Sequence, residues 1–577
     1  MTATGRPATG TGHPATDTST STGRSTVTTA TATATSTSTG ATAAGPPLGA
    51  ARPAQQLAGT GALLRLALRR DRLMMPLWIL LLGGSFASVA RSITSLYGTA
   101  AERAALAHSM NGDGLLRALY GPVFSDSAGG LTAWRMSGFG AALAAVMSLV
   151  IVVRHTRDEE ETGRQELLSS AGVGRRAPLT AALLAAAAAN AGLAGVTAAG
   201  LAASGEPAGG SVALALSVAA TGMLFACTAA LAAQLTESAR AAKAIGAAAV
   251  GGAYVLKAAG DAASDAGSSV LTWLSPVGWA ENVRPYAAER WWVLLLPAAA
   301  VAAQGALAYT LAARRDLGMS FLPARPGPAR GRMATAGALA LRLQRGSLYG
   351  WAAGFLVSGV VFGGIADGAG DLVGDNAGAR EIFERMGGHS GLTEAFLAAM
   401  TGVLGTVAAL YVVASVLRLH GEETGVRAEP LLAGAVGRLR WAAGHLAVAF
   451  GGSAAVVLAG GAGLALGYGR DPARVIGAAL AQLPAVWVFG GLAVLLYGAA
   501  PKAAPAAWAV AGLALSLDWL GPALNLPQPV LGLSPFGHLA KLPGAEMAWP
   551  PVAVLLLLTA ALVTAGLAAL RRRDMSG

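Results

Sequence analysis

The sequence carries little charge. Asp, Glu, Lys and Arg make up only 12% of its 577 residues, whereas about 25% is usual for a soluble globular protein. Hydrophobic residues make up 54%, and the mean hydropathy is +0.54. This composition excludes a soluble enzyme, and it also excludes a disordered protein, because disorder needs low hydrophobicity. We therefore expect a protein with many membrane spans.

Cysteine, aromatic residues and lysine are also scarce. The single cysteine, Cys227, lies in an apolar run, which excludes an intramolecular disulfide and predicts a small packing residue. Aromatic residues make up 6%, whereas glycine is abundant at 78 residues, which suits close packing of helices in lipid. Only four of the 41 basic residues are lysine, namely Lys243, Lys257, Lys502 and Lys541. Arginine and alanine this frequent are typical of a GC-rich genome, so we expect no nucleic-acid partner.

Sequence motifs for catalysis are absent. There is no G-x-x-x-x-G-K-[ST] phosphate-binding loop, no His/Glu cluster with zinc spacing and no G-x-S-x-G nucleophile elbow. We therefore expect no enzymatic activity, no cofactor and no metal site in this chain.

The apolar runs predict an all-α polytopic membrane protein with about 12 transmembrane helices. Residues 1–57 form a Thr/Ala/Ser-rich tail that we expect to be disordered and cytosolic. Residues 61–72 predict an interfacial helix that directs Arg69, Arg70 and Arg72 towards lipid headgroups. We place spans near residues 73–91, 136–153, 178–202, 211–233, 241–259, 292–312, 348–366, 396–417, 442–467, 475–498, 503–521 and 550–570. Counts of 11 or 13 stay open, because the alanine-rich runs have soft ends.

The distribution of basic residues predicts the orientation. With both termini in the cytosol, most of the 41 basic residues lie on the cytosolic side, as the positive-inside rule requires. The opposite orientation inverts this ratio. We therefore expect a multi-pass protein whose N- and C-termini are cytosolic.

The second half of the sequence repeats the first. Two short segments, segment A (residues 154–176) and segment B (residues 418–440), share a pattern of charged residues and glycine. Segment A has Glu160, Glu161, Gly163, Arg164, Glu166 and Arg175, and segment B has Glu422, Glu423, Gly425, Arg427, Glu429 and Arg438. Two further markers recur in the same order: Ser275–Gly278 with Ser534–Gly537, and Arg314–Asp316 with Arg572–Asp574.

The repeat predicts two six-span halves, at residues 58–318 and 335–577, joined by a cytosolic Pro/Arg-rich linker at residues 319–334. Because six is an even number, the halves have parallel topology and are related by an axis along the membrane normal.

Segments A and B are the conspicuous polar parts of the folded chain. Each begins with carboxylates and ends with arginine, which complements the dipole of a short helix. Taken alone, each is best interpreted as a solvated loop. Recurrence of the same side chains favours two equivalent docking elements for a twofold-symmetric cytosolic partner.

Two charged residues fall at equivalent positions of the predicted fifth and eleventh spans, namely Lys257 and Asp518. Charges at membrane depth are costly. Both side chains can extend to the outer interface. The alternative hypothesis is an ion pair between the two halves near an outer gate.

The repeated pattern resembles the permease subunit of a type-two ABC exporter, and in particular the actinobacterial permeases described as exporters of polyketide antibiotics. The resemblance covers about residues 60–577. It rests on Glu160 to Arg175, Glu422 to Arg438, Arg69 to Trp78, and the two Ser-Pro-x-Gly segments. It implies that an amphipathic elbow helix precedes the first span and that segments A and B form coupling helices. Two copies of a separate ABC ATPase, which would hold ATP and Mg²⁺, would dock on them. Val426 is inserted in segment B and Pro430 replaces the leucine that matches Leu167, which leaves open a different docking mode there.

The resulting prediction is the plasma-membrane permease of an ATP-driven exporter that contributes to multidrug resistance. It would move a hydrophobic or amphiphilic antibiotic, drug or lipid by alternating access. The main alternative is an ion-coupled secondary transporter, which would need carboxylates in mid-membrane, where Asp518 is the best candidate. A membrane-embedded enzyme and a scaffold or sensor are the remaining alternatives.

Overall fold

The computed structural model describes residues 53–112, 114–170, 172–264, 269–315, 319–322, 335–366, 391–520 and 527–574. Most of the predicted tail (residues 1–57) and of the predicted linker (residues 319–334) lies outside these residues. Within them, the regular secondary structure is helical, and one isolated β-bridge joins Thr236 and Leu322.

The helices before the linker extend from residue 53 to residue 314. They are α1 (Pro53–Gln56), α2 (Thr60–Arg70), α3 (Met74–Leu96), α4 (Ala100–Gly112), α5 (Gly114–Tyr120), α6 (Ala128–Arg154), α7 (Arg157–Glu161), α8 (Arg164–Ser170), α9 (Ala177–Ala203), α10 (Ala208–Leu235), α11 (Ala239–Ala262), α12 (Val270–Leu274), α13 (Pro276–Asn282), η1 (Trp291–Leu294) and α14 (Leu295–Arg314). We call this set the first helix group.

The helices after the linker extend from residue 336 to residue 572. They are α15 (Ala336–Ala366), α18 (Leu392–Thr424), α19 (Glu429–Leu432), α20 (Arg438–Tyr468), α21 (Pro472–Leu480), α22 (Leu483–Ala499), η2 (Pro501–Ala503), α23 (Ala506–Leu520), α24 (Gln528–Leu531), η3 (Pro535–His538) and α25 (Trp549–Arg572). We call this set the second helix group.

Among the described residues, ten helices are long and apolar enough to span a membrane. They are Met74–Leu96, Ala128–Glu161, Ala177–Ala203, Ala208–Leu235, Trp291–Arg314, Ala336–Ala366, Leu392–Thr424, Arg438–Tyr468, Pro472–Ala499 and Trp549–Arg572. Each coincides with a predicted span. The all-helical membrane fold is therefore confirmed, whereas the count of twelve spans in two repeats stays a prediction.

The two predicted spans that are missing from this set correspond to α11 and α23. Both segments are helical, but the charges of α11, which include Lys257 and Asp261, lower its hydropathy. Helix α23 has 15 residues, which at 1.5 Å per residue is shorter than the roughly 30 Å of a bilayer core. These two helices occupy the fifth position of each predicted half.

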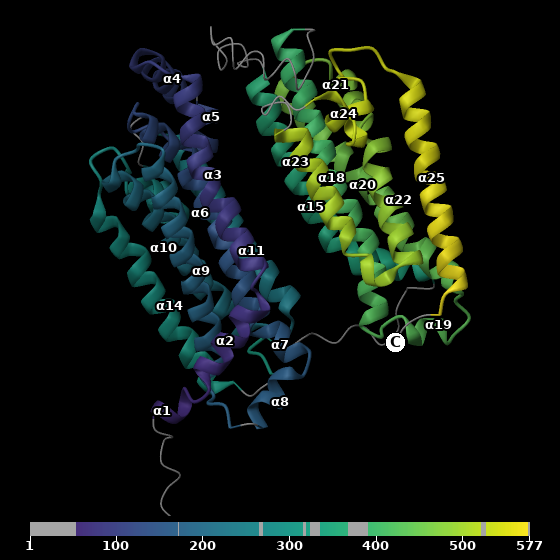
Figure 1. Cartoon of the computed structure of the whole chain (residues 1–577), viewed down its shortest axis with the longest axis horizontal. Helices are drawn as coiled ribbons and strands as arrows, with labels where there is room; N and C mark the ends of the chain where they lie inside the picture. The colour runs from purple at the N-terminus through teal and green to yellow at the C-terminus, as the bar shows by residue number, and fades with distance from the viewer. Residues whose placement is uncertain are drawn as a thin grey trace, which may run out of the picture. The chain divides into compact units, whose positions relative to one another are not determined.

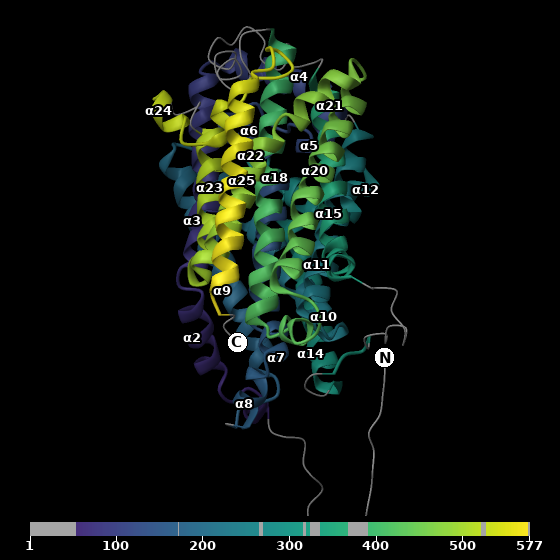
Figure 2. The same ribbon diagram turned by 90° about the vertical axis from the view of Figure 1, so that its right-hand side faces the viewer.

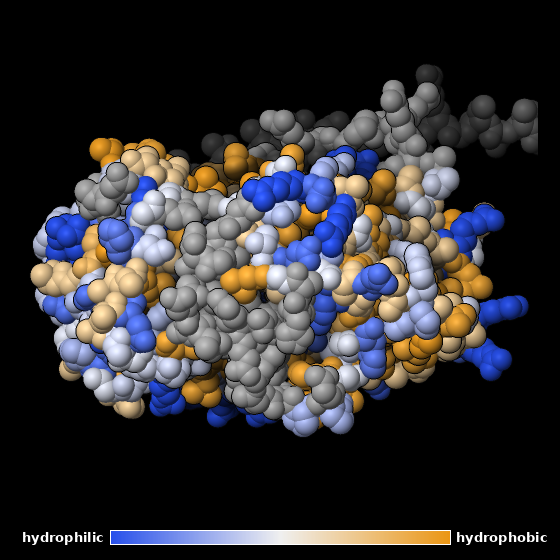
Figure 3. Space-filling view, turned by 90° about the horizontal axis from the view of Figure 1, so that it is seen from above, coloured by the Kyte–Doolittle hydropathy of each residue, from blue (hydrophilic) through white to orange (hydrophobic). Residues whose placement is uncertain are grey.

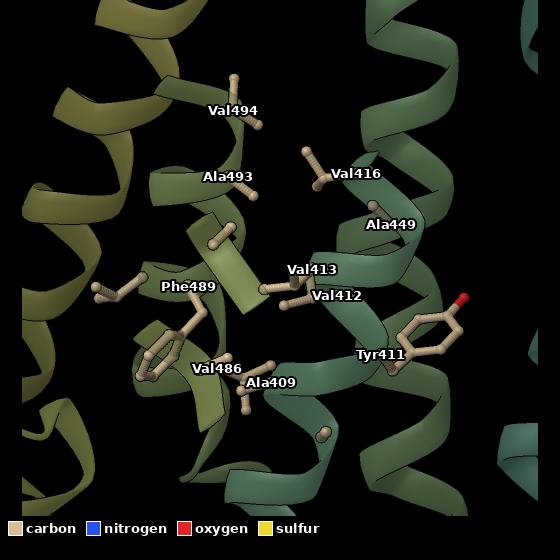
Figure 4. Close-up of a cluster of buried hydrophobic side chains, with 14 of the residues drawn as sticks. Ala409, Tyr411, Val412, Val413, Val416, Ala449, Val486, Phe489, Ala493 and Val494 are labelled. Atoms are coloured by element: carbon tan, nitrogen blue, oxygen red, sulfur yellow. The ribbon is translucent and has the colours of Figure 1, made fainter. Parts of the chain in front are cut away.

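Each helix group buries a core of its own. In the first group, α3, α6, α9 and α10 run side by side (Figures 1 and 2), and a buried cluster extends from Ala67 to Ala308. In the second group, a larger cluster extends from Phe355 to Leu570. Figure 4 shows part of it: Val412 and Val413 on α18 point towards Val486 and Phe489 on α22. A further buried cluster contains residues of both groups, including Leu116 and Leu464, and the division into two halves stays a prediction.

Glycines allow the closest helix contacts. On α15, a Cβ atom at Gly359 would lie 2.2 Å from the carbonyl oxygen of Gly460, and one at Gly363 would lie 2.2 Å from that of Leu464. On α20, a Cβ atom at Gly467 would lie 2.1 Å from the carbonyl oxygen of Val360. The backbones of α15 and α20 therefore touch, as the small-residue spacing of membrane helices allows.

The sides of several helices expose large apolar residues. Leu81 on α3 is 67% exposed and Leu557 on α25 is 70% exposed. Seen from above, hydrophilic residues are interspersed with hydrophobic ones (Figure 3). Apolar side chains this exposed along spanning helices are suited to contact with lipid.

Candidate functional site

Segment A folds into two short helices after α6. Helix α7 is acidic, and Gly163 then adopts a left-handed backbone with φ of +70° before α8 begins at Arg164. Glycine has no Cβ and tolerates this conformation at little cost. The sequence predicts one short helix here, and the glycine turn divides it in two.

The two repeated glutamates of segment A contact other helices. Glu160 forms an ion pair of 2.5 Å with Arg315, the residue after α14, and it also pairs with Arg157. The Glu161 carboxylate accepts a hydrogen bond of 2.7 Å from the backbone nitrogen of Ala239, the first residue of α11. Both glutamates therefore connect segment A to the helices that follow it.

Segment B has the same residues in a different backbone. Helix α18 continues through Glu422 and Glu423 to Thr424, and Val426 then adopts a φ of +58°. The inserted Val426 thus takes the left-handed conformation that Gly163 has in segment A. The short helix that follows, α19, has four residues, whereas α8 has seven.

The two repeated glutamates of segment B are buried and paired. Glu422 forms ion pairs of 2.5 Å with Arg418 and 2.8 Å with Arg427. Glu423 accepts two hydrogen bonds of 2.7 Å from the guanidinium of Arg573, the residue after α25. It also accepts a hydrogen bond of 2.6 Å from the hydroxyl of Tyr497 on α22.

A similar three-residue arrangement occurs in both helix groups, although its glutamates are not at matching positions, because Glu160 matches Glu422 and not Glu423. The arginine after the last spanning helix pairs with a repeated glutamate, and its own carbonyl oxygen accepts a hydrogen bond from the last repeated arginine. Arg175 donates to the carbonyl of Arg315 at 2.7 Å, and Arg438 donates to the carbonyl of Arg573 at 2.7 Å. We call Glu160–Arg315–Arg175 and Glu423–Arg573–Arg438 the terminal clamps.

The terminal clamps are partly shielded from water. The side chains of Arg315 and Glu160 are 7% and 10% exposed, and those of Arg573 and Glu423 are 15% and 3% exposed. The pKa of Arg573 is raised above its ordinary value, chiefly by its hydrogen bonds to Glu423. Charge-assisted, bidentate contacts of this kind are among the stronger ones in proteins.

These contacts change the interpretation of the repeated residues. Glu160, Glu161, Glu422 and Glu423 bind the chain's own residues, so an internal contact explains their recurrence. Side chains on the surface of segment A include Arg164, Glu166 and Leu167, the last of which is 75% exposed. On segment B the exposed set includes Gly425, Val426 and Glu429, and Val426 is 49% exposed.

The predicted elbow helix is present as α2. Arg70 pairs with Glu159 of segment A, whereas Arg69 and Arg72 are exposed. The buried Asp71 that follows α2 lies 2.6 Å from His155 and 3.2 Å from Arg154. Helix α2 is therefore bound to segment A by charge, a connection that the sequence did not suggest.

The predicted pair between Lys257 and Asp518 is not formed. The buried Lys257 ammonium lies 2.7 Å from Glu281 and 3.4 Å from Asp261, both in its own helix group. Asp518 accepts a hydrogen bond of 2.8 Å from Ser534. Because buried charged groups need close partners, each is bonded within its own helix group.

Several residues of the site were not found from the sequence. Arg315 and Arg573 appeared there only as markers of the repeat, although their recurrence after the last span of each half was the signal that could have identified them. Asp261 and Glu281 could have been found as carboxylates close in sequence to an intramembrane lysine.

Comparison with known proteins identifies the family. A family model described as the C-terminal domain of the multidrug efflux system permease Rv1217c matches residues 333–571. The multidrug efflux system permease protein Rv1217c of Mycobacterium tuberculosis (strain ATCC 25618 / H37Rv) is 45% identical over 532 residues, which cover 90% of this chain and 95% of the relative. The predicted resemblance to an exporter permease is thereby confirmed, and the chain belongs to the family of multidrug efflux system permeases.

Proposed function

We propose that this chain is the membrane permease of an ATP-driven exporter, and that it moves hydrophobic or amphiphilic compounds out of the cell. Two copies of a separate ABC ATPase, which hold ATP and Mg²⁺, dock on segments A and B. The name of the relative, a multidrug efflux system permease, supports efflux of more than one compound.

The terminal clamps are the observation that carries this proposal. A docking element has to transmit the movement of its ATPase to the spanning helices, and a mobile surface loop would dissipate it. Segment A is bonded to the end of α14 through Arg315 and to the start of α11 through Glu161. Segment B is bonded to the end of α25 through Arg573 and to α22 through Tyr497. Movement of either segment therefore displaces spanning helices of its own group.

Segment A also presents a surface suited to a partner. Leu167 is 75% exposed on α8 and follows the polar residues Arg164 and Glu166. An exposed apolar side chain beside polar ones resembles the centre of a binding patch, where apolar anchors contribute most of the binding free energy. We propose Leu167 as this anchor. Segment B has Pro430 at the matching position, so its ATPase docks with a different contact.

The proposal also includes the orientation in the plasma membrane. Segments A and B and both termini are cytosolic, with twelve spans in two parallel halves. The clusters Arg314–Arg315 and Arg571–Arg573 at the ends of α14 and α25 support this orientation through the positive-inside rule.

An ion-coupled secondary transporter is the second candidate, and one observation favours it. Asp261 and Glu281 are buried carboxylates of the kind that a proton relay uses. Both carboxylates lie beside the same residue, Lys257, and no matching pair occurs among the described residues of the second helix group. They are therefore better suited to a structural role. Transport by the purified permease without an ATPase would support this second candidate.

Co-purification and vesicle transport test the proposal. We expect an ATPase subunit encoded beside this gene to co-purify with the permease, and the reconstituted complex to move a fluorescent amphiphile only when ATP is supplied. Leu167→Asp should weaken association about tenfold, equivalent to about 1.4 kcal/mol. Leu533→Asp is the matched control, because Leu533 is 72% exposed and lies outside segments A and B.

Two results would reject the ATP-driven mechanism. One is that no ATPase subunit associates with the permease. The other is that transport runs at the same rate without ATP. If Leu167→Asp and Leu533→Asp associate equally well, Leu167 is not the anchor.

A further inference from the structure

The second helix group contains a pocket of about 320 Å³ between α18, the start of α22, α23 and the loops around η3. Apolar and polar side chains both line it. The apolar ones include Ala398, Val403, Leu515, Leu531, Phe536 and Leu539. A cavity that combines apolar side chains with a small number of polar groups is a common form of small-molecule site.

Two polar side chains of this pocket, Asp518 and Gln482, are available to a ligand. The Asp518 carboxylate uses one oxygen to accept the hydrogen bond from Ser534. The side-chain amide of Gln482, a residue only 5% exposed, has no hydrogen-bond partner within the described residues. Gln482 lines the pocket, so a ligand there can form a hydrogen bond with its amide.

Lys541 also lines the pocket but forms no ion pair with Asp518. Its side chain is exposed, whereas Asp518 is half-buried and is held by a serine that is 1% exposed. The Asp518 carboxylate lines the cavity, where charge interactions are less screened than in water. It is the acceptor in this pocket for a positively charged group.

Among the described residues of the first helix group, the pocket beside Glu281 has a volume of only about 10 Å³. There Lys257, which matches Asp518, contacts Glu281 directly at 2.7 Å. Glycines pack against that carboxylate, since a Cβ atom at Gly121 would lie 2.7 Å from its nearest oxygen. In the first group an internal ion pair therefore fills the position that is open in the second group.

We propose that the pocket binds amphiphilic compounds that carry a basic nitrogen, with the nitrogen paired to Asp518, the Gln482 amide hydrogen-bonded to a polar group and the apolar part against Phe536 and Leu539. The identification of this ligand as exported cargo rests on the proposed function. Binding itself does not, because the pocket lies within one helix group and needs no ATPase.

Direct binding tests the proposal without nucleotide or ATPase. The permease in phosphatidylcholine nanodiscs is titrated with a fluorescent amphiphile that has a tertiary amine, and with a matched analogue in which an amide replaces the amine. We expect the amine to bind at least tenfold more tightly than the amide. Asp518→Asn should raise the Kd of the amine at least tenfold and leave that of the amide within twofold.

Two further variants separate binding from folding. Asp518→Glu retains the charge and should bind the amine within threefold of the original protein. Asp471→Asn removes an exposed carboxylate elsewhere in the same helix group and should leave the Kd unchanged. Equal affinity of the original protein and Asp518→Asn for the amine would overturn the proposal, and so would equal affinity of the original protein for the two probes.

Phosphatidylethanolamine, a lipid whose headgroup carries an amine, is the other source of the same chemistry. Repeating the titration in nanodiscs of this lipid should change the Kd by less than threefold. An increase of tenfold or more would assign the pocket to the lipid and overturn its assignment to cargo. Loss of ATP-driven transport with binding intact would reject the proposed function and leave the pocket standing.

Discussion

At the scale of single residues, the two repeated segments differ most at Val426. Segment A makes its turn with Gly163 at a φ of +70°, whereas segment B uses the β-branched Val426 at +58°. A β-branched side chain is strained in this conformation, because its Cβ substituents crowd the neighbouring backbone.

Replacing this valine should therefore stabilise the protein. We expect Val426→Gly to raise the free energy of unfolding by about 1 kcal/mol, since strained residues of this kind cost roughly 1–3 kcal/mol. Thermal unfolding in detergent measures the effect. Val436→Gly is the control, because Val436 lies in the same segment without a positive φ and its replacement should lower stability. A lower melting temperature for Val426→Gly would show that the valine side chain contributes more by packing than it costs in strain.

Residue pairings were the least predictable feature. The sequence indicated that Glu160, Glu161, Glu422 and Glu423 matter, because they recur. It could not indicate whether they bind another protein or the chain itself. Arg315 lies 155 positions after Glu160, and Arg573 lies 150 positions after Glu423. Pairing across such distances depends on packing, which periodicity does not report.

At the scale of helices, hydropathy predicted the elements well, because a spanning helix needs an apolar run of known length. Ten predicted spans coincide with apolar helices. The exceptions, α11 and α23, were ambiguous for physical reasons: one carries charges that its own group neutralises, and the other is short.

The contact between α15 and α20 depends on glycine and can be tested on one helix. Gly359 of α15 lies against the backbone of α20, whereas Gly354 of the same helix faces open space. We expect Gly359→Val to separate the two helices and to lower the melting temperature by several degrees, and Gly354→Val to leave it within about one degree.

The yield of monodisperse protein in size-exclusion chromatography provides a second measurement. Equal behaviour of Gly359→Val and Gly354→Val would mean that α15 and α20 can part without loss of the fold.

At the scale of the whole molecule, the terminal clamps should determine how well ATP hydrolysis is coupled to transport. Arg315→Ala and Arg573→Ala remove the contact between a docking segment and the end of its last helix. In the proposed function, docking uses other side chains, so we expect ATP hydrolysis to continue while the number of molecules moved per ATP falls about tenfold.

The chain provides matched controls for this measurement. Arg314 and Arg572 directly precede the clamp arginines, are exposed and have no ion pair within the described residues. Their alanine variants should keep the ratio of transport to hydrolysis within twofold of the original. A clamp variant that keeps this ratio would show that the clamps are structural only. Arg573→Lys retains the positive charge, so it should couple transport to hydrolysis better than Arg573→Ala does.

The clamps also determine when each half of the protein is finished during synthesis. Glu423 and Arg573 are 150 residues apart, and Glu160 and Arg315 are 155 apart. At translation speeds of roughly 5–20 residues per second, each arginine is synthesised roughly 8–30 s after its glutamate. Segment A or B therefore reaches its final form only after the last helix of its group has been translated. If an ATPase docks there as proposed, a nascent or truncated permease offers it an incomplete surface.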